Sequence, residues 1–154
     1  MFFFAQYTAH PKHNTQNPTH KTQHIYIMLL TPGTEYTSTL VVSERHLACN
    51  LGSGDLRVLA TPAMMALMEN AAMQLAAQGL DEGTTTVGGQ ISASHLKPTG
   101  LGHTVTATAR LESVEGRKLR FHVTASDEDG LIGEGDHLRF VVDRERFMAK
   151  VSNK

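Results

Sequence analysis

The sequence predicts an α+β fold in which an antiparallel sheet of about five strands wraps one long central helix. The first observation is a stretch at residues 61–78 that carries helix signals and is apolar around most of its circumference. The second is a series of segments from residue 84 onward in which apolar and polar side chains alternate, as they do in strands. A helix this apolar has to be buried, and a sheet with one apolar face needs a cover, so each element satisfies the other.

The helix has a clear start and a clear end in the sequence. Thr61 can accept a hydrogen bond from a first-turn N–H group, and Pro62 lacks the N–H group that would be left unpaired there. Gly79 predicts the end of the helix. At about 100° per residue, the polar side chains of the helix form one stripe, made of Asn70, Gln74 and Gln78.

Glu69 does not belong to that stripe. It projects about 140° from the centre of the stripe, among methionine and alanine side chains, so we expect its carboxylate to be half buried or more. A buried carboxylate has to find a hydrogen-bonding partner, take up a proton or face a solvent-filled pocket. Each of these outcomes suits a catalytic acid or base.

Strand signals occur before and after the helix. The predicted strands span residues 37–42, 84–97, 104–114, 119–126 and 131–142, and residues 43–59 are expected to be irregular. Gly116 and Gly130 belong to the turns that join the last three strands. The predicted order is one strand, one long helix and a meander of four strands, which is the hotdog arrangement.

Gly88 and Gly89 interrupt the strand that follows the helix. Glycines inside a strand often mark a bulge or a place where another group approaches the backbone, so both are candidate substrate-binding residues. A small sheet also leaves unpaired edge strands, and pairing between the edges of two copies would extend it. We therefore expect a homodimer formed by sheet-edge pairing.

Composition excludes several classes of protein. The 154 residues, 40% hydrophobic and 19% charged, fit one domain, which we place at residues 35–148. The net charge of −1 gives no footprint for nucleic acid or a membrane surface, and no apolar run approaches the roughly 18 residues of a membrane span. The single cysteine, Cys49, excludes an intramolecular disulfide and has no nucleophile motif around it. Because one cysteine fits a reducing compartment, we expect a cytoplasmic protein, and one that uses no cofactor.

Residues 1–28 are expected to be a disordered extension, because the part from residue 5 to residue 27 is polar and shows no periodicity. Its histidines have spacings that could bind a metal ion, but no cysteine or carboxylate accompanies them, so we expect no metal site. These histidines are His10, His13, His20 and His24. Met28 stands just before ordinary folded sequence, and we hypothesise that it is the natural start. Sequencing the N-terminus of the natively expressed protein tests this hypothesis.

Three motifs occur together in the chain. Thr61 and Pro62 precede Glu69, residues 87–99 contain the glycine pair and His95, and residues 133–142 form the closing strand. With these motifs, the sequence from about residue 36 to about residue 147 resembles the fluoroacetyl-CoA thioesterase-like family of hotdog-fold thioesterases. The resemblance implies hydrolysis of an acyl-CoA thioester. It also implies that Thr61, Glu69 and His95 form the catalytic group and that Gly88 lines the acyl site.

The implied chemistry agrees with the residue types. A thioester carbonyl needs a nucleophile or an activated water, a donor for the developing oxyanion and a proton for the leaving thiolate. Glu69 can attack or act as a base, His95 can shuttle a proton at neutral pH, and Thr61 can orient the carboxylate or the water. N–H groups near Gly88 or the helix N-terminus can hold the oxyanion. An acyl-glutamate intermediate and direct attack by water both remain open.

Several of these residues also have a purely structural interpretation. Thr61 would cap a helix in any protein, and a histidine at a strand end, such as His95, usually faces water. His137 and Arg139 share one side of the last predicted strand, where we expect structural or solvent-facing roles, although Arg139 could contact a phosphate. The basic residues that could hold the CoA phosphates are Arg57, Lys97, Arg117, Lys118 and Arg120, and the sequence does not rank them.

The acyl group and two competing functions also stay open. In the fluoroacetyl-specific member of the family, aromatic lid residues lie shortly before the threonine, whereas residues 52–57 contain no aromatic residue, so we expect a short or medium acyl-CoA substrate. One alternative is a non-catalytic acyl-CoA-binding protein. The other, a hotdog enoyl-CoA hydratase, rests on an echo of that group's signature at residues 17–20, which lacks the accompanying residues and precedes the fold.

Overall fold

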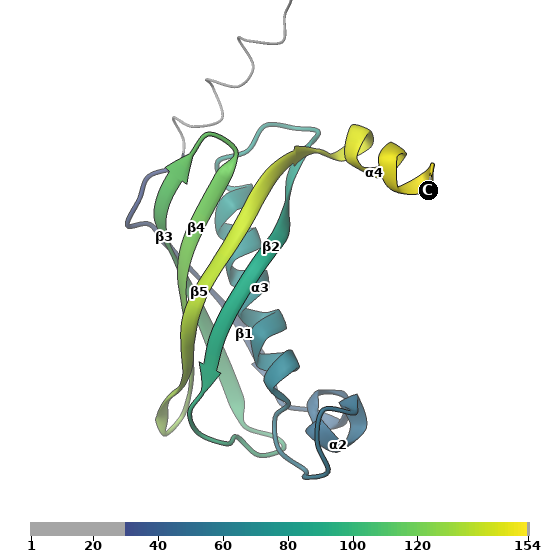
Figure 1. Ribbon diagram of the computed structural model, residues 1–154. Helices are drawn as coiled ribbons and strands as arrows, with labels where there is room; N and C mark the ends of the chain where they lie inside the picture. Colours follow the sequence, from purple (N-terminus) through teal and green to yellow (C-terminus); the bar gives the residue numbers. More distant parts are fainter. Residues whose placement is uncertain (1–29, 154) are drawn as a thin grey trace, which may run out of the picture.

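Five antiparallel strands curl around one long helix in the computed structural model, which describes residues 30–153 (Figure 1). The elements are β1 (Glu35–Val41), the 3-10 helix η1 (Glu44–His46), α2 (Ala48–Leu51), α3 (Thr61–Ala77), β2 (Thr84–His95), β3 (Thr104–Glu115), β4 (Lys118–Asp127), β5 (Gly130–Asp143) and α4 (Arg144–Ser152). The predicted α+β architecture, with the sheet around a central helix, is confirmed. The predicted extension at residues 1–28, including its histidines and the segment 17–20, lies outside the described residues.

The strand order corrects the predicted meander of four strands. The order in the sheet is β1-β3-β4-β5-β2, so only β3, β4 and β5 follow one another as neighbours. Strand β2 pairs with β5, because β1 already occupies the free side of β3. Gly116 and Gly130 lie in the tight turns of the meander and have φ angles of +60° and +109°, which other residues rarely adopt. Strands β1 and β2 are left as the two edges of the sheet.

The core lies between α3 and the concave face of the sheet. The buried residues of α3 are Met64, Leu67, Met68, Ala71, Ala72, Leu75 and Ala76. They meet the inward-facing residues of β3 and β4, which are Val105, Ala107, Ala109, Leu111, Leu119, Phe121, Val123 and Ala125. The predicted alternation of these two strands is confirmed. Burying each large apolar side chain contributes about 1.5–3 kcal/mol to stability, so this interface holds the helix in place.

The start of α3 differs from the predicted cap. Ala60 is the N-cap residue, and its carbonyl accepts from the N–H groups of Ala63 and Met64 at 3.0 and 3.1 Å. Thr61 is the first helical residue and makes no capping hydrogen bond with its side chain. The Thr61 hydroxyl is therefore available for another partner.

Two further regions are more ordered than their sequences predict. Residues 43–59 contain η1 and α2, which are too short to produce a helical periodicity. An isolated antiparallel β-bridge joins Leu47 to Leu59, and both residues are almost completely buried, which fixes the end of this segment. At the other end of the molecule, α4 extends away from the sheet (Figure 1) and has no buried residue. No helix among residues 30–153 combines the length and the apolar character that a membrane span requires.

Candidate active site

The first polar pair of the site joins the start of α3 to the end of β2. Oγ1 of Thr61 lies 2.9 Å from Nδ1 of His95, within hydrogen-bond distance. The pair combines residues 34 positions apart in the sequence, and Thr61 is its exposed member. The other ring nitrogen of His95, Nε2, is buried and has no hydrogen-bond partner among residues 30–153. The structure therefore gives the Thr61 hydroxyl a partner that is not part of its own helix.

The environment of His95 favours the neutral ring. Burial lowers the pKa of His95 below its usual value near 6.5, and the backbone of Lys97 opposes this effect only in part. A neutral imidazole can accept a proton at pH 7. The Thr61–His95 pair has the composition of a hydroxyl and a base in hydrogen-bond contact, which is the arrangement that activates a hydroxyl or a bound water.

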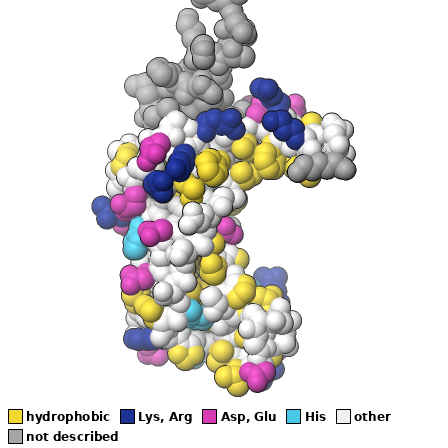
Figure 2. Space-filling view, viewed as in Figure 1, with side chains coloured by type: hydrophobic (Ala, Val, Ile, Leu, Met, Phe, Trp, Pro, Cys, Tyr) yellow, Lys and Arg dark blue, Asp and Glu magenta, His cyan; other side chains and the backbone are white. Residues whose placement is uncertain are grey.

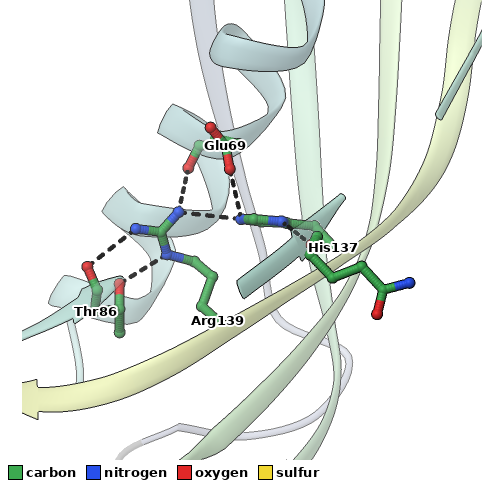
Figure 3. Close-up of polar contacts among 5 residues, drawn as sticks. Glu69, Thr86, His137 and Arg139 are labelled. Atoms are coloured by element: carbon green, nitrogen blue, oxygen red, sulfur yellow. Dashed lines mark hydrogen bonds and ion pairs between the residues drawn. The ribbon is translucent and has the colours of Figure 1, made fainter. Parts of the chain in front are cut away.

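The second polar cluster surrounds Glu69, farther along α3 (Figure 3). The Glu69 side chain is 42% exposed, which confirms the predicted half-buried carboxylate. Its Oε1 atom lies 3.7 Å from Nε2 of His137, whose side chain is completely buried. Glu69 therefore has one side toward open space and one side against buried polar groups.

Arg139 makes most of the hydrogen bonds in this cluster. Its Nε atom donates to the Thr86 hydroxyl at 2.8 Å, and its Nη2 atom donates to the Thr86 carbonyl at 3.1 Å. Its Nη1 atom approaches the Glu69 carbonyl at 3.4 Å and Nε2 of His137 at 3.1 Å. Figure 3 shows these contacts converging from α3, β2 and β5. Burial lowers the pKa of Arg139 and the Glu69 carboxylate opposes that effect, so Glu69 is the counter-charge of the buried guanidinium.

For His137 and Arg139, the structure decides between the structural and the solvent-facing roles that the sequence left open. They are only 1% and 6% exposed, so they are not solvent-facing, and they contact the Glu69 cluster directly. A usable signal exists in the strand pattern, because both residues are in phase with Val141, which is also buried. Their polar character conceals that phase in a hydrophobicity pattern.

The two candidate glycines have different surroundings. A Cβ atom at Gly88 would lie 2.8 Å from Oε1 of Glu69 and 3.4 Å from Cε1 of His137, so the missing side chain makes room for the carboxylate. Gly89 falls where the β2–β5 register shifts, and a Cβ atom there would overlap the ring of Phe140. The predicted bulge is confirmed. Of the two glycines, the structure brings Gly88 to the Glu69 cluster and places Gly89 against Phe140.

The three predicted catalytic residues do not meet within one chain. Glu69 lies eight positions after Thr61 on the helix, which corresponds to an axial rise of about 12 Å. In the described part of the chain, no hydrogen bond or ion pair joins Glu69 to Thr61 or to His95. The structure thus unites Thr61 with His95, and Glu69 with Gly88, His137 and Arg139.

A groove of about 350 Å³ runs along the first half of α3. Its lining is mostly apolar, with Leu40, Leu51, Pro62 and Ala66 among the residues, and Arg45 adds a positive charge. Figure 2 shows the concave face of the molecule, with apolar side chains exposed between α2 and α4. A groove of this character can accept an apolar chain. Thr61, Glu69 and His95 are not among the residues that line it.

Some of the basic residues proposed to hold the CoA phosphates already have partners within the chain. Two of the candidate phosphate ligands are engaged with carboxylates, Arg57 with Glu44 and Arg120 with Glu115. Nothing in the described chain ranks Lys97 or Lys118. Within residues 30–153, no group of three or more His, Cys, Asp or Glu side chains is arranged to hold a metal ion.

Comparison with known proteins identifies the family. A family model described as fluoroacetyl-CoA-specific thioesterase matches residues 42–145. A fluoroacetyl-CoA thioesterase from Streptantibioticus cattleyicolor is 44% identical over 97 residues, which are 63% of this chain and 70% of that protein. A crystal structure of a fluoroacetyl-CoA thioesterase shares 37% identity and a TM-score of 0.76, covering 80% of this chain and 96% of the other. A hot-dog-like protein from Thermanaerovibrio acidaminovorans shares 26% identity and a TM-score of 0.74, covering 81% and 93%.

These similarities cover nearly all of the folded region. They confirm the predicted hotdog fold and the predicted class of enzyme, a thioester hydrolase. The chain therefore belongs to the family of fluoroacetyl-CoA-specific thioesterases.

Proposed function

We propose that the protein hydrolyses a short or medium acyl-CoA thioester to the free acid and CoA. The observation that carries this proposal is the pairing of Thr61 with His95 at the start of α3, on the same helix as a carboxylate, Glu69, that faces open space. These groups supply a hydroxyl, a base and a nucleophile or second base. The related proteins named as fluoroacetyl-CoA thioesterases support the same reaction class for this chain.

In the proposed reaction, Glu69 either attacks the thioester carbonyl or takes a proton from the attacking water. If Glu69 is the base, the proton that it takes from the water passes through the Thr61 hydroxyl and His95 to the sulfur atom as the C–S bond breaks, and CoA leaves as a thiol. If Glu69 is the nucleophile, the C–S bond breaks to give an acyl-glutamate and a thiolate; His95 then takes a proton from the water that hydrolyses the acyl-glutamate and gives it to the thiolate. The positive end of α3, where Thr61 is the first helical residue, stabilises the oxyanion. Glu69 as nucleophile and Glu69 as base both satisfy this scheme.

The acyl group is proposed to be short or medium without selectivity for fluoroacetyl. Residues 52–57 are exposed throughout and contain no aromatic side chain that could cover an acyl group. Nothing in that segment supplies the aromatic contacts of a fluoroacetyl lid.

We propose that the protein acts as a homodimer. Strand β2 is an unpaired edge, and α3 keeps an exposed apolar stripe that includes Pro62, Ala66 and Ala77. Pairing of β2 with a second copy would satisfy the edge, and the second copy would cover the stripe. Because Thr61 and Glu69 are separated by about 12 Å along the helix, we further propose that Thr61 and His95 of one subunit act with Glu69 of the other.

We also propose a cytoplasmic location. A reducing compartment would keep Cys49 as the free thiol that it is here.

Release of free thiol from a panel of acyl-CoA esters tests the proposed reaction. We expect the wild type to release CoA well above the uncatalysed rate and Glu69→Gln to lose most of that activity. If the wild type binds acyl-CoA without releasing CoA, the protein is a binding protein instead. Addition of water to an enoyl-CoA without thiol release would favour a hydratase.

Mixed dimers test the division of the site. Glu69→Gln and His95→Ala are each expected to keep only a small, measurable residual activity as pure proteins. If the site spans two subunits, a mixed dimer regains one intact site, and random exchange restores about a quarter of the wild-type activity. A mixture that keeps only the residual activity after subunit exchange would place all three residues in one subunit.

A further inference from the structure

His137 is buried behind Glu69 and makes a hydrogen bond with each of its ring nitrogens. Nδ1 lies 2.7 Å from the Gln90 carbonyl, which can only accept, so Nδ1 carries the proton. Nε2 lies 3.1 Å from Nη1 of Arg139, which can only donate, so Nε2 carries none. The Glu69 carboxylate lies 3.7 Å from Nε2, beyond hydrogen-bond distance, so the two hydrogen-bond partners define the state of the ring, a neutral imidazole protonated at Nδ1.

The surroundings of His137 agree with that state. Burial lowers the pKa of His137, and the positive charge of Arg139 acts in the same direction, while the Gln90 carbonyl and the Glu69 carboxylate oppose them. On strand β4, the centroid of the Phe121 ring lies 6.4 Å from that of His137. Protonation at Nε2 would direct one N–H group at another and bring a second positive charge next to Arg139.

The hydrogen bonds of His137 and Thr86 fix the position of Arg139 next to Glu69. Arg139 is anchored on one side by Thr86 and on the other by His137, which leaves Nη1 directed at the Glu69 backbone. We propose that His137 is a positioning residue for the reaction: its neutral ring joins Gln90 to Arg139 and so holds the guanidinium, 3.4 Å from the Glu69 carbonyl, whose positive charge attracts the Glu69 carboxylate. This inference rests on the proposed function, in which Glu69 takes part in the chemistry.

A pair of substitutions separates positioning from packing. His137→Phe keeps a ring of similar shape but removes both hydrogen bonds, and we expect kcat to fall about 100-fold with little change in KM, because a small displacement of a reacting group has that effect. His137→Gln keeps an amide oxygen that can accept from Arg139 and is expected to recover kcat to within about tenfold of the wild type. A folded His137→Phe protein with wild-type kcat would overturn the inference.

A double-mutant cycle shows whether His137 acts through Glu69. In the Glu69→Gln background, we expect His137→Phe to cause no further loss of kcat/KM. If the two losses multiply instead, His137 does not act through Glu69 and the inference is wrong.

The wild-type protein supplies a readout that requires no variant to fold. The nitrogen chemical shifts of the assigned His137 ring at pH 7 should show a neutral ring protonated at Nδ1. A ring protonated at Nε2, or at both nitrogens, would contradict the inference whatever the activity.

The outcomes also separate this inference from the proposed function. If the wild type releases no thiol from any acyl-CoA, the proposed function fails and the positioning role fails with it. If the wild type is active and Glu69→Gln has lost most of that activity, while folded His137→Phe is fully active, only the positioning role fails.

Discussion

The absence of a side chain at Gly88 leaves room for the Glu69 carboxylate. The space that its Cβ atom would occupy lies 2.8 Å from the Glu69 carboxylate oxygen, closer than a carbon atom can normally approach. The neighbour is the flexible end of a side chain, so a larger residue would displace the carboxylate more readily than the backbone. Position 88 therefore controls where Glu69 points.

Gly88→Ala is expected to reduce kcat about 100-fold with only a small change in melting temperature, because the carboxylate moves and the sheet does not. Steady-state kinetics and thermal unfolding measure the two effects. Gly100→Ala is the matched control, since a Cβ atom there would make an ordinary 3.5 Å contact with the His103 ring. Wild-type kcat in Gly88→Ala would show that this glycine does not set the position of Glu69.

His95 and His137 both have to be neutral in the proposed scheme, and both have a pKa below the usual value near 6.5. Activity should therefore fall on the acidic side, with midpoints below 6.5. Because two protons inactivate the enzyme, the wild-type profile of kcat/KM should be steeper at its acidic end than that of either variant, His95→Ala or His137→Gln. An unchanged steepness in His95→Ala would reject its role as acid or base.

At the scale of elements, close approach of β2 and β5 depends on glycines in β5. A Cβ atom at Gly135 would overlap the Ser92 carbonyl and lie 2.5 Å from Cα of Ala93. These atoms belong to the backbone of the neighbouring strand and cannot rotate away. The pairing that brings His137 and Arg139 beneath Glu69 therefore needs glycine at this position.

Gly135→Ala is expected to destabilise the fold by about 3 kcal/mol, because overpacking against backbone forces the strands apart. Chemical denaturation measures this loss. Gly88→Ala lies on the partner strand and is the informative comparison, since it should lose activity while keeping stability. Equal stability of the Gly135→Ala protein and the wild type would show that β2 and β5 separate at little cost.

The ends of α3 follow from local sequence, whereas the partner of the Thr61 hydroxyl does not. The sequence signals located the helix within one residue at each end, because Pro62 fixes its own φ angle at the start and Gly79 is a poor helix former at the end. They assigned the Thr61 hydroxyl to the helix itself, whereas the structure pairs it with His95. The location of a helix end is a local property, but the partner of an exposed hydroxyl depends on which strand lies beside it.

At the scale of the whole molecule, the two buried histidines link protonation to stability. Their folded pKa values are lowered, whereas the unfolded chain titrates near 6.5, so the unfolded state binds more protons as pH falls below that value. Their contribution to stability is complete above pH 6.5 and is lost as pH falls through the folded pKa values.

The melting temperature should therefore fall between pH 7 and pH 5.5, and the decrease should be smaller in His137→Gln than in the wild type. Calorimetry or circular dichroism at a series of pH values measures it. The acidic groups with lowered pKa values, Glu44 and Glu128, titrate below this range and do not interfere. Parallel curves for the two proteins would show that His137 takes up its proton as easily in the folded state as in the unfolded one.

The proposed homodimer belongs to the same scale. We expect sedimentation at about twice the 16.8 kDa of one chain, since β2 and the apolar stripe of α3 both need cover. A monomer at concentrations where the enzyme is fully active would contradict the dimer and the shared site together.

The sequence by itself determined the fold class, the central helix and the strands of the later sheet. Periods of 3.6 and 2 residues express local geometry, and they also placed Glu69 at the edge of the buried face of α3. Three motifs together indicated the family: Thr61 and Pro62 with Glu69, residues 87–99, and residues 133–142.

Only the tertiary structure decided the strand order and the composition of the two polar clusters. Arg139 contacts Thr86 across 53 positions of the sequence, and Thr61 contacts His95 across 34. The first contact depends on the register of β2 against β5, which shifts by one residue at the bulge at Gly89, and the second depends on how α3 packs against the end of β2. A hydrophobic period cannot report this register, because a polar residue facing the core has the same pattern as one facing water.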